Sequence, residues 1–198
     1  MNFKNHIETA WNLTLRNIVA LLLLTLVFWG ASILTLGILM PVTLAGYTQS
    51  LILLLREGRE PKMQDLFSEM KLFLPLLVFG IACFVVSTIG FMLFFLPGVV
   101  VVFGVTFFCI YMVPLMTDQK LGLIDAIKES YAMTRRVPLV DHLVMVIIYM
   151  AISTIGGSIV IGILFTQPLA ILFLASVYEE NKTQVSPVET SAKIDSES

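Results

Sequence analysis

Three long stretches of this chain lack any charged side chain. Only 13% of the 198 residues are charged, and every Asp, Glu, Lys and Arg falls outside residues 18–55, 72–116 and 143–178. A Lys, Arg or Asp at the centre of a bilayer costs about 2.5–3.5 kcal/mol on insertion scales. This distribution excludes an ordinary soluble domain and predicts a membrane protein with several spans.

The sequence is also poor in residues that bind metals or catalyse reactions. His6 and His142 are too far apart for a zinc signature, and no H-E-x-x-H, G-x-S-x-G or phosphate-loop pattern occurs. Cys83 and Cys109 lie deep in apolar stretches. We interpret them as packing residues, with a disulfide as the alternative. We therefore expect no catalytic residue, no metal and no cofactor, and the lack of a basic stripe argues against nucleic-acid partners.

Each uncharged stretch is long enough for two membrane passes. A helix over residues 18–55 would be about 57 Å long, nearly twice the thickness of the hydrocarbon core. Each stretch has Gly or Pro near its middle, at Gly37 to Pro41, Pro97-Gly98 and Gly156-Gly157, where we expect the chain to reverse. The predicted fold is all-α, a polytopic helical membrane protein with three transmembrane hairpins. The six predicted spans are about 18–36, 39–55, 72–95, 98–116, 139–157 and 159–178, with a disordered tail at 179–198.

Three hairpins place every charged segment on one side of the membrane. These segments hold all twelve Lys and Arg residues, and the three far-side turns hold none. The positive-inside rule then predicts that both termini lie in the cytoplasm. The first hairpin is the weak point, because residues 42–55 are few for a full crossing.

An amphipathic segment precedes each hairpin, with apolar residues at helical spacing and charged residues beside them. Such segments are typical of helices that lie in the headgroup plane, and packing against the cytoplasmic ends of the bundle is the alternative. Their apolar stripes are Phe3, Ile7, Trp11, Leu15 and Ile18; Met63, Leu66, Phe67, Met70 and Phe73; and Ile124, Ile127 and Tyr131.

Three basic residues just before the fifth predicted span are candidates for contact with anionic lipid. They are Lys128, Arg135 and Arg136. Juxtamembrane basic residues gain about 1 kcal/mol each near an anionic leaflet, and the guanidinium group forms paired hydrogen bonds with phosphate. The alternative is a solvated face paired with Asp125 and Glu129.

Polar, uncharged residues inside the spans are the second group of candidates. Tyr47, Gln49 and Gln167 are costly to bury unpaired, so each is expected to meet a partner. Two interpretations remain open: interhelical hydrogen bonds, or the lining of a polar path through the bundle.

Several loose motifs resemble a known family. They are the loop 54–61 leading into Asp65-Leu66-Phe67, the Pro97-Gly98 pair after residues 90–96, and the helix 124–131. Together they resemble the membrane domain of some bacterial glycerophosphoryl diester phosphodiesterases and related bacterial six-span proteins, over Ala10 to about Tyr178. The resemblance implies a bacterial multi-span protein of the cytoplasmic membrane. The catalytic domain of the phosphodiesterases is not part of it, so no catalytic residue is carried over.

The sequence thus predicts a non-enzymatic multi-pass protein of the bacterial cytoplasmic (inner) membrane. It would act by association with membrane lipids, with other envelope proteins or with itself. A small transporter or channel subunit is the main alternative, and a membrane-embedded lipid enzyme has the least support because no catalytic constellation is present.

Overall fold

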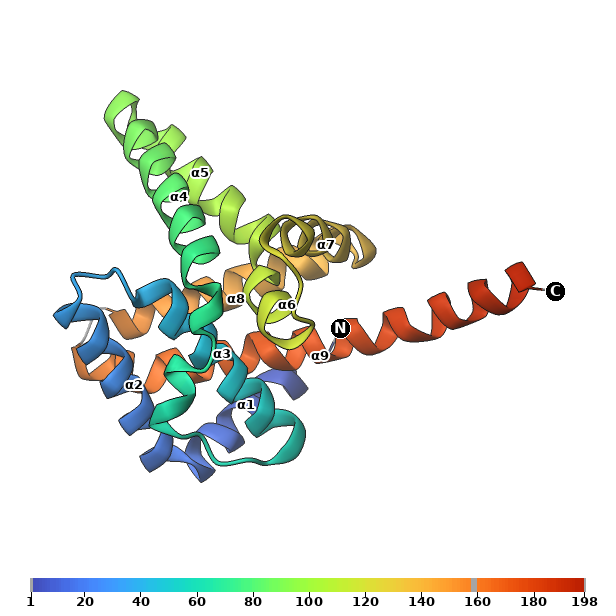
Figure 1. Ribbon diagram of the computed structural model, residues 1–198, viewed down its shortest axis with the longest axis horizontal. Coiled ribbons are helices and arrows are strands. Elements are labelled where there is room, and N and C mark those ends of the chain that lie inside the picture. Colours follow the sequence, from blue (N-terminus) through green and yellow to red (C-terminus); the bar gives the residue numbers. More distant parts are fainter. Residues whose placement is uncertain (1, 158–159, 198) are drawn as a thin grey trace.

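The structure is a computed structural model that describes residues 2–157 and 160–197, and within them every regular element is a helix (Figure 1). The predicted all-α class is therefore confirmed for this part of the chain. The elements are α1 (Phe3–Arg16), α2 (Ile18–Leu34), α3 (Met40–Glu57), the short 3-10 helices η1 (Met63–Phe67) and η2 (Met70–Leu72), α4 (Phe73–Leu93), α5 (Phe95–Cys109), α6 (Met112–Asp118), α7 (Leu123–Arg136), α8 (Leu139–Gly157) and α9 (Val160–Glu197).

Several of these helices are long and apolar enough to cross a membrane. Three helical stretches qualify without a sharp bend, Met63–Leu93, Phe95–Asp118 and Gly162–Lys182. Two bent pairs bring the number to five if each is one span: α1 with α2 at 89°, and α7 with α8 at 118°. Such helices are those of a membrane-embedded protein.

The central helix of the body is α3. It packs against α2, α4, α6, α9 and η1, and most of its side chains are buried. Because protein surrounds it, α3 can hold small and polar residues that a lipid-facing helix would exclude. Its buried residues are Val42, Thr43, Ala45, Gly46, Tyr47, Thr48, Ser50, Leu51, Ile52 and Leu54.

The α4–α5 hairpin projects away from this body, and its two helices pack mainly on each other (Figure 1). The predicted reversal at Pro97-Gly98 is wrong, because α4 ends at Leu93 and the chain turns at the extended residue Phe94. Pro97 instead lies in the first turn of α5, where its missing N–H group costs nothing. Gly98 contacts the ring of Phe91 and the backbone of Gly90, which brings the two helices close together.

The first hairpin reverses where the sequence predicts it. Leu36 and Gly37 have positive φ angles of 51° and 82°, and Pro41 follows at the start of α3. The predicted third reversal, at Gly156-Gly157, coincides with the end of α8, and residues 158–159 between α8 and α9 lie outside the described residues.

The fourth predicted span, residues 98–116, is not one continuous helix. It breaks at Ile110–Tyr111 into α5 and α6. Pro114 explains the break, because its ring would clash with the carbonyl of Ile110 and it has no N–H group to donate to that carbonyl. The second amphipathic segment also differs, since η1 and η2 replace the single helix that its spacing predicts.

The last helix continues beyond the predicted end of the sixth span. α9 runs from Val160 to Glu197, where we predicted a disordered tail from residue 179. Glu179, Glu180 and Lys182 pair with other parts of the body, as described below, and these contacts hold this part of α9 on the body.

Candidate functional site

Asp118, whose side chain is only 5% exposed, lies at the end of α6 and joins three helices through its carboxylate. Its carboxylate accepts hydrogen bonds from Arg56 Nη1 at 2.9 Å, Lys182 Nζ at 2.6 Å and the Tyr178 hydroxyl at 3.1 Å. Arg56 also donates to Glu179 Oε1 at 2.5 Å. Hydrogen bonds to these two carboxylates raise the pKa of Arg56, so its positive charge is secure.

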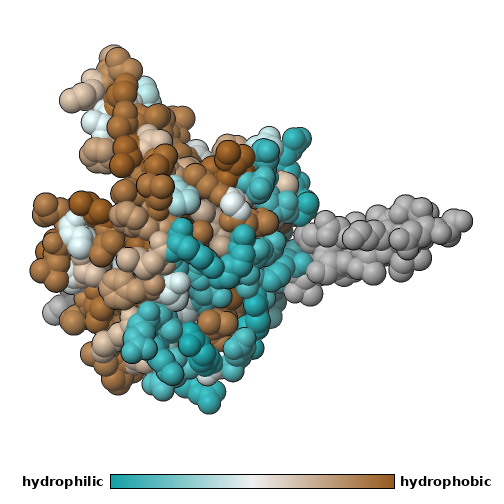
Figure 2. Space-filling model, viewed as in Figure 1, coloured by the Kyte–Doolittle hydropathy of each residue, from teal (hydrophilic) through white to brown (hydrophobic). Residues whose placement is uncertain are grey.

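Further contacts bring the N-terminal charged segment into this polar network and link the loop after α6 to the segment between η1 and η2. His6 Nε2 of α1 lies 2.5 Å from Glu180 Oε2, and its Nδ1 lies 2.7 Å from Ser176 Oγ. Lys120 Nζ donates to the buried Glu69 at 2.8 Å. All four charged segments of the sequence therefore meet in one region. Figure 2 shows hydrophilic residues gathered on one side of the body, whereas the α4–α5 hairpin is hydrophobic.

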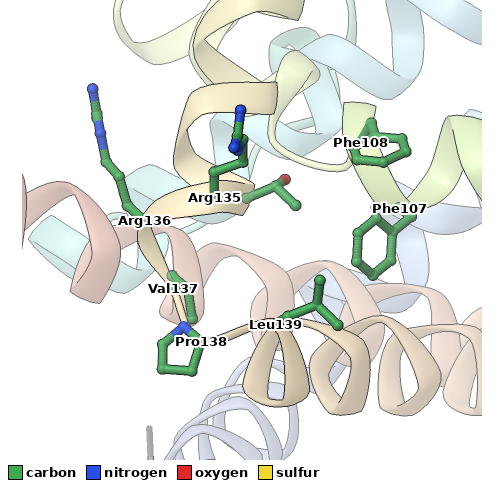
Figure 3. A pocket seen from close by; sticks show the side chains of 8 residues that line it. Phe107, Phe108, Arg135, Arg136, Val137, Pro138 and Leu139 are labelled. Atoms are coloured by element: carbon green, nitrogen blue, oxygen red, sulfur yellow. The ribbon is translucent and has the colours of Figure 1, made fainter.

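A second feature is an open cavity of about 530 Å³ where α7 bends into α8. Figure 3 shows the Phe107 and Phe108 rings on one side of it and Arg135 and Arg136 on the other, with Val137, Pro138 and Leu139 lower in the view. Its floor is apolar and its rim is basic. The residues of this α7–α8 pocket are Phe107, Phe108, Thr134, Arg135, Arg136, Val137, Pro138 and Leu139.

Three hydrogen bonds fix the walls of the pocket at the break between α5 and α6. Ser130 on α7 donates to the Phe108 carbonyl at 2.7 Å and accepts from the Tyr111 N–H at 3.3 Å. His142 Nε2 on α8 lies 2.8 Å from the Phe107 carbonyl, so its N–H donates there. Carbonyls that the broken helix leaves unpaired are thus satisfied by the helices that line the pocket.

The three predicted basic residues differ in their surroundings. Arg136 pairs with Glu129 at 2.8 Å, which is the solvated pair that the sequence offered as an alternative. The Arg135 guanidinium lies 5.8 Å from the centroid of the Tyr131 ring, and within the described residues no carboxylate is paired with it. Lys128 is exposed on α7 but does not line the pocket.

The predicted polar-path residues are distributed over two helices. Tyr47 of α3 is fully buried, and its hydroxyl lies 2.7 Å from Thr25 Oγ1 of α2. Because the Thr25 hydroxyl donates to the Leu21 carbonyl, Tyr47 is the donor of this interhelical bond. Gln49 is half-buried, and its Oε1 atom has no hydrogen-bond partner in the described part. Gln167 is half-buried on α9.

Sequence reasoning missed the polar network and the aromatic wall of the pocket. The network could have been suspected from the acidic and basic residues at the ends of the predicted spans, such as Arg56, Asp118 and Lys182. Phe107 and Phe108 gave no such signal, because apolar residues fill the whole stretch around them.

Comparison of the chain with protein-family models, with curated proteins and with solved structures gives no match. The resemblance to the membrane domain of glycerophosphoryl diester phosphodiesterases stays a prediction, and the functional argument rests on the geometry of this chain.

Proposed function

We propose that this chain is a non-enzymatic multi-pass protein of the bacterial cytoplasmic membrane that acts by binding anionic lipid. Six membrane-inserted helices form three hairpins, α2–α3, α4–α5 with α6, and α8–α9, and both termini lie in the cytoplasm. The α7–α8 pocket, an apolar cavity with a basic rim, is the observation on which this function rests.

The polar network supports the orientation. Arg56, Asp118 and Lys182 come from three different charged segments and are paired directly. Segments that touch one another cannot lie on opposite sides of a bilayer. The N-terminal segment joins them through His6 and Glu180. Because the four segments together contain all the Lys and Arg residues, the positive-inside rule assigns their side to the cytoplasm.

Helix α1 has the surface of an interfacial helix. It meets α2 at 89° and presents three different faces. One face packs on α9 and the body, a second is apolar and exposed, and a third is charged and exposed. An exposed apolar stripe beside a charged one suits the boundary between acyl chains and headgroups. The three faces are His6, Ala10 and Thr14; Ile7, Trp11 and Leu15; and Lys4, Glu8 and Arg16.

The pocket offers separate surfaces to the two parts of a phospholipid. Phe107, Phe108 and Leu139 provide apolar area for an acyl chain, and Arg135 provides a guanidinium free of any carboxylate in the described region. Tyr131 holds that guanidinium in a cation–π contact, which orients it without neutralising it. A lipid phosphate beside Arg135 would complete its paired hydrogen bonds.

Lipid retention in nanodiscs tests this function. The Arg135→Gln/Arg136→Gln variant should retain less phosphatidylglycerol than the unaltered protein, measured by mass spectrometry of lipid that stays bound through purification. Loss of two juxtamembrane charges at about 1 kcal/mol each predicts roughly 30-fold weaker binding. An Arg135→Lys protein should retain more phosphatidylglycerol than the double variant but less than the unaltered protein, because an ammonium group cannot form the paired hydrogen bonds of a planar guanidinium.

The matched control is Lys4→Gln/Arg16→Gln. It removes the same charge from the exposed charged face of α1, which does not line the pocket. If both double variants retain phosphatidylglycerol equally, the arginines act only as topology signals and the proposed lipid site is wrong.

The transporter alternative has one observation in its favour. Gln49 Oε1 is buried without a hydrogen-bond partner among the described residues, as expected for an acceptor that binds a polar substrate. Gln49→Leu separates the two functions. It should leave lipid retention unchanged, and loss of an uptake or export phenotype in a stable Gln49→Leu protein would favour the transporter.

A further inference from the structure

The reversals of the α2–α3 and α4–α5 hairpins lie at different levels along the axis of α4. Gly80 of α4 lies beside Pro41, because a Cβ atom on Gly80 would be 3.7 Å from Pro41 Cγ. Pro41 belongs to the start of α3, close to the reversal of the first hairpin. From Gly80, α4 continues to Leu93, which is about 20 Å of helix. The α4–α5 hairpin therefore extends well beyond the α2–α3 reversal (Figure 1).

The loop after α3 limits the depth of the first hairpin from the other side. The backbone of Asp65 and Leu66 packs directly against Gly46, in the middle of α3. There the Asp65 carboxylate accepts hydrogen bonds at 2.8 Å from both Ser50 Oγ and Arg59 Nη2. Only about 9 Å of helix, from Gly46 to Met40, separates this charged loop from the reversal.

A full crossing by the first hairpin would bury that loop. The hydrocarbon core is about 30 Å thick, so a reversal at the far surface would place the Asp65–Arg59 pair deep inside it. Charged groups at such depth are costly. The charged loop can stay among the headgroups only if the reversal stops near the middle of the bilayer.

The α2–α3 reversal has the properties of a turn that lies in hydrocarbon. Its exposed side chains are apolar, and each of its backbone N–H groups from Thr35 to Met40 has an acceptor within the hairpin. Leu39 N–H, for example, donates to Thr35 Oγ1 at 3.3 Å. Backbone groups in a bilayer must be satisfied internally, and this turn meets that requirement.

The α4–α5 reversal does not satisfy all its backbone N–H groups internally. Neither α3 nor α5 has a side-chain cap, but the N–H groups of Phe95 and Leu96 have no acceptor among the described residues, whereas those of the first reversal are paired through Met40. The first turn of any helix leaves such donors without an internal partner. The Phe94–Phe95 turn therefore needs water or headgroups, which a hairpin finds only by crossing to the opposite surface.

We propose that α2–α3 is a re-entrant hairpin whose partner is the acyl-chain region of the cytoplasmic leaflet, whereas α4–α5 crosses the bilayer. The leaflet assignment rests on the orientation in the proposed function. This inference replaces the first two of the six predicted spans with a hairpin that enters and leaves on the same side.

Depth-dependent quenching tests the inference with two matched sites. Leu34 and Phe94 are both apolar, are 86% and 76% exposed, and flank the two reversals. Each is replaced by cysteine in a background in which Cys83 and Cys109 are changed to Ser, and a bimane fluorophore is attached after purification. The proteins are then reconstituted in phosphatidylglycerol/phosphatidylethanolamine vesicles that contain nitroxide-labelled lipids.

The label at Leu34→Cys should be quenched most by nitroxides near the ends of the acyl chains. The label at Phe94→Cys should be quenched most by headgroup nitroxides. In sealed vesicles, a membrane-impermeant maleimide should modify an unlabelled Leu34→Cys thiol roughly tenfold or more slowly than a Phe94→Cys thiol, because the thiolate forms poorly in hydrocarbon.

Headgroup quenching at both sites, or similar maleimide rates at both, would overturn the inference and leave six full spans. Neither result affects lipid retention at Arg135, so failure of the inference and failure of the proposed function are distinguishable. A Thr35→Val substitution tests the role of the turn hydrogen bonds. It removes the acceptor for Leu39 N–H, and because that donor would then need water, a fluorophore at Leu34→Cys should report a more polar environment.

Discussion

The α2–α3 and α4–α5 hairpins both come from uncharged stretches of the sequence but have different surroundings. On α2 and α3, one side of the hairpin is packed into the body and joined by the Thr25–Tyr47 hydrogen bond. On α4, only Leu76 and Gly90 are buried, and exposed Val, Ile and Phe side chains cover the rest. The first hairpin is held mainly by protein, and the second depends on lipid to cover it.

This difference shows what an uncharged apolar stretch does and does not determine. It specifies that a segment enters the membrane, because charged groups are excluded from hydrocarbon. It does not specify how deeply, since depth depends on where neighbouring loops pack, as the loop at Asp65 and Leu66 packs on Gly46. The comparison predicts that substitutions matter on α3 where their counterparts on α4 and α5 do not.

Gly46→Val should have the largest effect on stability. Its side chain would collide with the backbone of Asp65 and Leu66, which cannot move as a flexible side chain can. Overpacking of this kind costs about 1–3 kcal/mol, and we expect about 3. Gly104→Val on α5 meets open space and should change the free energy of unfolding by about 0.5 kcal/mol or less. Denaturant titration in detergent measures both, and equal losses would remove the distinction between the hairpins.

Asp118→Asn should have the second largest effect, a loss of about 2 kcal/mol in the free energy of unfolding. The change leaves Lys182 without a carboxylate partner in the polar network, and Arg56 keeps only Glu179. Removing one member of a buried pair costs about 3–5 kcal/mol, and the partial exposure of Arg56 and Lys182 lowers that figure. Glu129→Gln, which breaks an exposed pair with Arg136, is the control and should cost about 0–1 kcal/mol. A harmless Asp118→Asn would mean that the network does not hold α3, α6 and α9 together.

Tyr47→Phe should have the smallest of the three effects, about 1 kcal/mol, because it removes one buried interhelical hydrogen bond. Its counterpart on the second hairpin is Thr88→Val, which removes an exposed hydroxyl that bonds only to its own helix at Phe84. That variant should be within about 0.5 kcal/mol of the unaltered protein. Thermal unfolding in the same detergent would measure both, and a larger loss for Thr88→Val would reverse the assignment of protein-facing and lipid-facing hairpins.

Much of the fold follows from charge and apolar length alone. Four of the residue ranges predicted as spans coincide closely with the helices α2, α3, α4 and α8, because a charged segment marks one end of each. The reversal at Phe94 could not be predicted, since Pro97 is tolerated in the first turn of a helix and so does not mark the turn. The break before α6 depends on Pro114 together with partners on α7 and α8 that lie far away in sequence.

The candidate site was predicted in part. Arg135 and Arg136 were recognised from their position before an apolar run, and both line the pocket. The difference between them could not be seen in the sequence, because it arises from the pairing of Arg136 with Glu129 and the position of Arg135 over Tyr131.

Two-sided labelling of single cysteines tests the central claim, that every charged segment lies on the cytoplasmic side, most directly. Lys62→Cys, Lys128→Cys and Phe94→Cys place exposed thiols in two charged segments and at the second reversal. With an impermeant maleimide, we predict that Phe94→Cys reacts in intact cells, whereas Lys62→Cys and Lys128→Cys react only in inverted membrane vesicles. Reaction of Lys62→Cys in intact cells would contradict the account.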